Sequence, residues 1–97
     1  MNIIEVEAVN DAVLARANVE GPDRTYTVVF LYSREEYEGH LGQTLSRWTC
    51  QMTGATYKDA SGNRRKVPSN ARHLRHQLFF VPHQIVQADL TRDGYIH

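Results

Sequence analysis

The sequence predicts an α+β fold in which an antiparallel sheet packs on one amphipathic helix. Apolar and polar residues alternate along residues 2–33, as in strands with one buried face. Residues 34–53 change to helical spacing, and alternation returns after them. The 97 residues are 41% hydrophobic and 23% charged, which fits a single domain over 1–97 with one core.

Residues 2–33 are typical of a three-stranded antiparallel β-meander. A first strand is expected around residues 3–9, followed by a short turn at Asn10. "DAVLARANVE" at 11–20 has the period of two, and Gly21-Pro22-Asp23 then marks a turn. "RTYTVVFLYS" at 24–33 is β-branched and aromatic on both faces, which indicates a central strand.

Residues 34–53 predict the amphipathic helix. Ser33 begins a capping-box pattern, acids gather in the first turns, and Gly54 suits a helix C-cap. Gly39 and Gly42 each cost about 1 kcal/mol relative to Ala inside a helix. The apolar positions at spacings of four, four, three and four are Tyr37, Leu41, Leu45, Trp48 and Met52.

The remaining residues predict a basic hairpin and two C-terminal strands. Residues 55–67 form the hairpin, with its turn at Ser61-Gly62-Asn63. Alternation over 71–81 indicates a strand that ends or bends at Pro82, because proline removes a backbone donor. A last strand is expected over 84–90. The predicted core is Ile4, Val6, Val13, Ala15, Val28, Phe30, the five helix positions, Leu78, Phe80, Ile85 and Val86.

The stretch "LFFVPHQIVQADL" resembles the closing segment of SH3-like barrels. In that pattern Val81 and Pro82 end a strand, and Ile85 points back into the core. The resemblance covers 13 of the 97 residues and implies a partly open SH3-like barrel. A long helix after three strands departs from a minimal barrel of this kind, so no family function is carried over.

Several function classes lack their sequence signals. Cys50 is the single cysteine, which excludes an intrachain disulfide and a CxxC pair. The start "MNIIEVEAVND" has acids where a signal peptide needs a basic region, and no apolar run reaches about 18 residues. GxSxG, P-loop and GxGxxG motifs are absent. We expect a cytoplasmic, non-enzymatic protein without a cofactor and without a membrane partner.

The segment "RHLRHQLFFVPHQ" at 72–84 concentrates three histidines. In a strand, His73 and His76 point to opposite faces, and His83 lies beyond the proline. A zinc site needs three or four ligands that converge, so we assign no metal site and no catalytic residue. A histidine-based nuclease, with arginines holding the phosphate, stays open as a third alternative.

The distribution of charge is the most informative functional feature. Residues 1–46 carry three cations and eight acids, whereas residues 47–97 carry eight cations and three acids. Residues 58–75 alone hold six Lys or Arg and one acid. Such a segment suits phosphate, although a solvated loop has the same composition. The predicted residues for binding nucleic acid or a nucleoprotein are Tyr57, Lys58, Arg64, Arg65, Lys66, Arg72, His73 and Arg75.

A second function class fits the same charge distribution. A neutral domain with one acidic and one basic half can act as a protein–protein inhibitor or adaptor, in the style of small accessory proteins of phages and mobile elements. The same polarity allows self-association into a homodimer. The sequence leaves both alternatives open beside the nucleic-acid-binding module.

Overall fold

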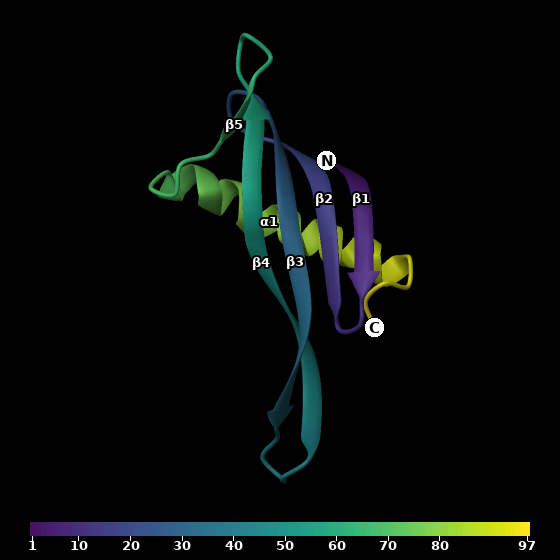
Figure 1. The fold of residues 1–97 in the computed structure, drawn as a ribbon. Coiled ribbons are helices and arrows are strands. Elements are labelled where there is room, and N and C mark those ends of the chain that lie inside the picture. Colours follow the sequence, from purple (N-terminus) through teal and green to yellow (C-terminus); the bar gives the residue numbers. More distant parts are fainter.

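The computed structural model describes residues 1–97 and has one antiparallel sheet with one helix packed on it (Figure 1). The strands lie in sequence order, β1-β2-β3-β4-β5, so the sheet is an open meander with edges at β1 and β5. The expected barrel is wrong, because these edges do not meet. The elements are β1 (Asn2–Val9), β2 (Ala12–Glu20), β3 (Thr25–Glu38), β4 (Thr44–Lys58), β5 (Arg64–Lys66) and α1 (Arg72–Arg92).

The predicted N-terminal meander is confirmed. β1 and β2 pair from Asn2–Asn18 to Val9–Ala12, and the turn between them has Asn10 at φ 53°. Asparagine tolerates this left-handed conformation better than most residues. β3 lies in the middle of the sheet, as its apolar character on both faces predicts.

The predicted helix over 34–53 is wrong: these residues continue β3 and form β4. The two strands pair without interruption from Glu38–Thr44 to Phe30–Met52. Gly39 and Gly42, which counted against the helix, form the turn, where Gly42 has φ 76°. Threonine, tryptophan and cysteine in β4 favour strand over helix, so local propensity outweighs the apparent apolar stripe.

Gly54 is a strand residue and does not cap a helix. It pairs with Val29, while the next pair along the ladder is Phe30–Met52, so Thr53 is an extra residue in β4. This irregularity is a β-bulge, which bends the strand and increases its twist. The bulge lies within the broad part of the sheet, because β2 still pairs with β3 as far as Ser33.

The two predicted C-terminal strands are also wrong, because residues 72–92 form α1. Its buried side chains are spaced by four: Leu78, Pro82, Val86 and Leu90. Pro82 therefore lies inside the helix on its buried side and does not end a strand. The C-terminal tail follows Gly94 at φ 87° and brings Ile96 into the core. Over the short stretch 71–81, the spacing of apolar residues fits both the period of a strand and the period of a helix, so the pattern alone does not distinguish the two.

The core lies between α1 and one face of the sheet. Tyr32 and Phe30 are the largest fully buried side chains, and the Tyr32 hydroxyl donates to the backbone oxygen of His83 at 2.6 Å. The buried hydrophobic residues are Val13, Ala15, Ala17, Val19, Tyr26, Val28, Phe30, Tyr32, Ala55, Val67, Leu78, Val86, Leu90 and Ile96.

The predicted core is confirmed only in part. Val13, Ala15, Val28, Phe30, Leu78 and Val86 are buried. Trp48, Met52 and Val6 are partly buried and pack against the core. Exposed instead are Ile4, Tyr37, Leu41, Leu45, Phe80 and Ile85. Five of these six misplaced residues follow from the wrong secondary structure at 34–53 and 71–90, whereas Ile4 lies in the correctly predicted first strand and lines the uncovered face.

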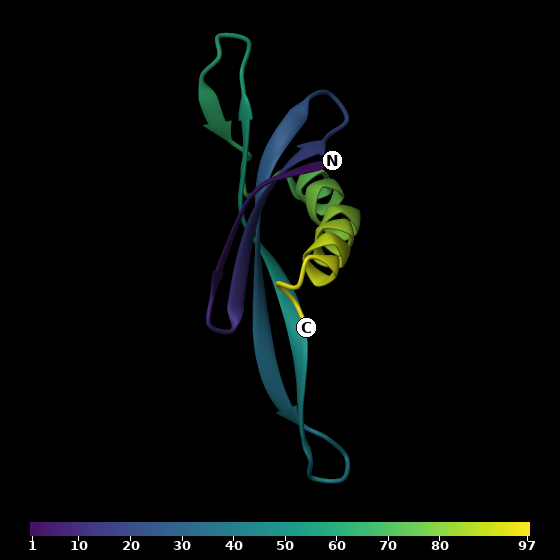
Figure 2. The ribbon, with the colours of Figure 1, turned by 90° about the vertical axis from the view of Figure 1, so that its right-hand side faces the viewer.

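The molecule is long and has two projections. It measures 56 × 28 × 19 Å and has a radius of gyration of 15.3 Å, against about 12–13 Å for a compact domain of this size. Figure 2 shows α1 on one side of the sheet, with the β3–β4 hairpin and the β4–β5 hairpin extending at opposite ends. The other side of the sheet is uncovered. The helix is not apolar enough to cross a bilayer.

Candidate functional site

The uncovered face of the sheet holds the largest groove of the molecule, about 820 Å³ in volume. Strand alternation puts its β2 and β3 residues here, because their neighbours in sequence point to the core under α1. Three threonines and an asparagine line its floor, and four cations surround them. The lining residues are Ile4, Arg16, Asn18, Arg24, Thr25, Thr27, Val29, Gly54, Thr56, Tyr57, Lys58 and Arg64.

The groove is positively charged, because none of its lining residues is acidic. Arg16 is paired with Glu5 at 3.5 Å and Arg24 with Asp23 at 3.1 Å, and all four side chains are exposed. Lys58 and Arg64 have no acidic partner within 4.0 Å. Exposed ion pairs are weak and exchange with solvent, so all four cations can face a ligand.

The register of β4 and β5 sets the position of the basic hairpin. Lys58 pairs with Arg64, and Thr56 pairs with Lys66, so these four side chains lie on the uncovered side. The Arg64 guanidinium donates to the Thr56 hydroxyl at 2.8 Å, which holds it over the sheet. Lys66 extends the positive surface along β5, again without an acidic partner.

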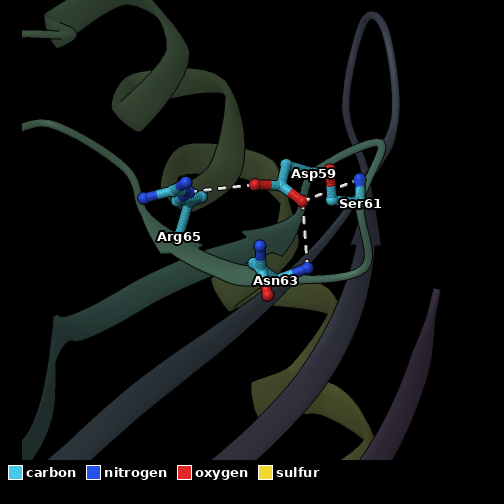
Figure 3. Close-up of polar contacts among 4 residues, drawn as sticks. All are labelled: Asp59, Ser61, Asn63 and Arg65. Carbon is cyan, nitrogen blue, oxygen red and sulfur yellow. Dashed lines mark hydrogen bonds and ion pairs between the residues drawn. The ribbon is translucent and has the colours of Figure 1, made fainter.

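Asp59 organises the turn of this hairpin (Figure 3). Its Oδ1 accepts from the backbone N–H groups of Ser61 and Asn63, both at 2.9 Å. Its Oδ2 accepts from Arg65 Nε at 3.0 Å. The Arg65 hydrogen bond, followed by the backbone N–H groups, lowers the pKa of Asp59. The single acid of the basic segment thus holds the turn in place, and Arg65 is the one of the four hairpin cations that is paired with an acid.

Tyr57 lines the groove and also contacts Tyr26 edge to face, with 5.7 Å between the ring centroids. The Arg24 guanidinium lies over its ring at 4.5 Å from the centroid. Asp23 in turn accepts from the Tyr26 hydroxyl at 2.9 Å. These contacts fix Arg24 at the rim of the groove. Base stacking on Tyr57 stays a prediction. It requires the Arg24 guanidinium to leave the face of the Tyr57 ring, so that a base can take its place.

Arg72, His73 and Arg75 are in the first turn of α1, on the side of the sheet opposite the groove. Arg72 and His73 are exposed and Arg75 is half-buried. The basic segment predicted as one continuous surface is therefore divided between two sides of the molecule. Their role in binding stays a prediction.

Sequence reasoning missed Arg16 and Arg24 as members of the site. Both belong to the half of the chain with an excess of acid, so neither stands out in a count along the sequence. A usable signal was present in "VLARANV", where Arg16 occupies the polar side of a regular alternation. Register then places Arg16 opposite Val29, within the groove.

The histidines pack on aromatic rings of α1. His76 stacks on Phe80 at 5.1 Å and His83 on Phe79 at 4.5 Å. Burial lowers the pKa of His83, whose Nδ1 is buried without a hydrogen-bond partner. The separation of His73 from His76 by strand alternation is wrong, since both lie on the helix, but no three potential ligands converge there.

Cys50 is half-buried, and burial raises the pKa of its thiol to about 11. A thiol of this kind is almost entirely protonated at neutral pH and is a poor nucleophile. Cys50 pairs with Tyr32 and lies on the side of the sheet that faces α1.

Comparison with protein-family models, curated proteins and solved structures gives no match for this chain.

Proposed function

We propose that this protein is a non-enzymatic module that binds nucleic acid through the groove on the uncovered face of the sheet. One observation carries the proposal: four cations from β2, β4, β5 and the β2–β3 turn surround one groove that no acid lines. Lys66 continues this surface beside the groove.

The arrangement favours a phosphate backbone over a single small anion. The cations come from positions across the width of the sheet, so together they match repeated charges along a strand. Arginine can hold phosphate through two parallel hydrogen bonds, and lysine contributes a point charge. Threonine hydroxyls on the floor can donate to phosphate or sugar oxygens. Because the proposed contacts are to phosphate and sugar, binding is expected to depend little on base sequence.

Fluorescence anisotropy with labelled oligonucleotides of about 20 nucleotides tests the proposal. Single-stranded RNA, single-stranded DNA and duplex DNA serve as separate probes. We expect the double variant Lys58→Ala/Arg64→Ala to weaken binding by about 10- to 100-fold, because each lost phosphate contact restores a condensed counterion.

A matched control removes two cations elsewhere. Arg47→Ala/Arg92→Ala changes the net charge equally, but both residues lie outside the groove and are exposed. We expect it to bind within about threefold of the unaltered protein, as long-range charge effects are screened at physiological salt. Equal losses in the two variants, or no binding of any probe by the unaltered protein, would refute the proposal.

A further inference from the structure

The distal part of the β3–β4 hairpin projects from the sheet as an arm. β2 stops pairing with β3 at Ser33, so beyond this residue β3 pairs only with β4. We define the arm as residues 34–48. Its end carries three exposed apolar side chains: Tyr37, Leu41 and Leu45. Leu41 is 91% exposed, so nothing within the same chain covers the end of the arm.

A second apolar patch lies on the outer side of α1. Phe80, Val81 and Ile85 are 52%, 58% and 47% exposed. The other side of the helix, with Leu78, Pro82 and Val86, faces the core. Clustered exposed apolar residues on a small domain mark interaction surfaces more often than single ones do. The chain therefore carries two separate apolar patches, one on the arm and one on the helix.

Two of the apolar residues at the end of the arm, Tyr37 and Leu45, lie on the same side of the ribbon. Ser33–Thr49 and Tyr37–Leu45 are directly opposed pairs four residues apart, so they share one side of the ribbon. At Ser33 this is the uncovered side, since its neighbour Tyr32 is buried. Figure 1 shows β3 and β4 crossing and exchanging places below the broad sheet. The ribbon is therefore strongly twisted between the broad sheet and the end of the arm, so the side that carries Tyr37 and Leu45 turns away from the direction of the uncovered face.

The molecule is thick where α1 covers the broad sheet and thin along the arm. Figure 2 shows α1 beside the broad sheet, whereas the arm continues past the C-terminal end of α1 with no element beside it. A second copy, inverted by a two-fold axis perpendicular to the sheet strands, would place its α1 next to the first arm and its arm next to the first α1. Each α1 would then occupy the open space beside the arm of the other chain.

Charge favours the same pairing. The arm holds three acids and two cations, and its Arg47 is already paired with Glu35 at 2.9 Å. α1 holds three arginines and one acid, Asp89, which is paired with Arg92 at 3.4 Å. The arm thus carries an excess of acid and α1 an excess of base, while Glu20 at the end of β2 lies beside Phe80 and Val81.

We propose that two copies of this chain form a reciprocal dimer, in which the arm residues Tyr37, Leu41 and Leu45 of each copy pack on Phe80, Val81 and Ile85 of the other. The interface is isologous, so it contains the arm–helix contact twice. Both grooves stay on the outer sides of the dimer, because they lie on the face of the sheet opposite α1. The proposal is independent of nucleic-acid binding.

Analytical ultracentrifugation of the purified protein tests the dimer at concentrations up to about 100 µM. We expect the unaltered protein to dimerise. Leu41→Asp should raise the dissociation constant by at least about a hundredfold, because it removes a buried leucine from both contacts. Ile85→Asp should do the same. Val9→Asp is the matched control. Val9 is 57% exposed and pairs with Ala12, whose neighbour Val13 is buried under α1, so Val9 lies on the uncovered face and its dimer should persist.

Mixing the two disrupted variants distinguishes the proposed contact from others. A heterodimer of Leu41→Asp with Ile85→Asp contains one doubly altered contact and one intact arm–helix contact, whereas each variant alone has no intact contact. We therefore expect the mixture to dimerise more tightly than either variant. Contacts from arm to arm or from helix to helix give no such recovery, and this result would overturn the proposal.

Two further results would also overturn it. One is a monomeric unaltered protein over the whole concentration range, which would leave the apolar patches to a different protein partner. The other is dimerisation that survives both aspartate substitutions. Circular dichroism melting at a concentration below the dimer dissociation constant serves as the folding control, and the high exposure of Leu41 in the monomer predicts an unchanged midpoint for Leu41→Asp.

Discussion

The two faces of the sheet use the same strands for different purposes. On the face under α1, β2 and β3 contribute eight buried residues, from Val13 to Tyr32. On the other face the same strands present Arg16, Asn18 and three positions in the groove. Strand alternation separates the two sets completely. Stability and ligand binding should therefore respond to different substitutions, even at neighbouring residues of one strand.

The largest expected contrast between the faces is in stability. Phe30→Ala removes a fully buried ring and should lower the free energy of unfolding by about 3–5 kcal/mol. Thr27→Ala, three residues earlier on the uncovered face, should change it by less than about 1 kcal/mol. Urea unfolding followed by circular dichroism measures both. Similar losses for the two variants would show that the uncovered face is also part of the core.

A smaller contrast concerns the polar link between the sheet and α1. Tyr32→Phe keeps the buried ring but removes the hydrogen bond to the His83 backbone oxygen. We expect a loss of about 1 kcal/mol, typical of one buried hydrogen bond. The same urea titration gives the value, and Tyr37→Phe on the exposed arm is the control, with no measurable change expected. A stable Tyr32→Phe variant would mean that another donor satisfies this carbonyl.

The smallest contrast is in thiol reactivity. Burial raises the pKa of Cys50 to about 11, so the reactive thiolate is scarce near pH 8 and increases as the pH rises toward this pKa. Iodoacetamide should modify native Cys50 at least about tenfold more slowly than a cysteine introduced at Thr27 in a Cys50→Ser background. Equal rates would place Cys50 on the solvent side, contrary to its pairing with Tyr32.

The sequence predicted the first three strands because both of their signals agreed. Turn residues at Asn10 and Gly21 bounded segments with strict alternation. From residue 34 the signals conflicted. Five apolar residues matched a helix by coincidence, while Gly39 and Gly42 were turn residues, and the pairing partner that decides between the two was distant in sequence.

The C-terminal helix was not predicted, for a related reason. Pro82 argues against both a helix and a central strand, and its place on the buried side of α1 depends on packing against the sheet. The candidate site was predicted in part. Lys58, Arg64 and Lys66 followed from composition, whereas Arg16 and Arg24 join them only through the register of β2, β3 and β4.

The salt dependence of nucleic-acid binding tests the central claim most directly. Anisotropy titrations between about 50 and 200 mM salt give the slope of log affinity against log salt concentration. For the unaltered protein, the four groove cations predict a slope of about −3 to −4 on duplex DNA, and Lys58→Ala/Arg64→Ala should reduce its magnitude by about 2. A slope that is unchanged in this variant would contradict binding in the groove.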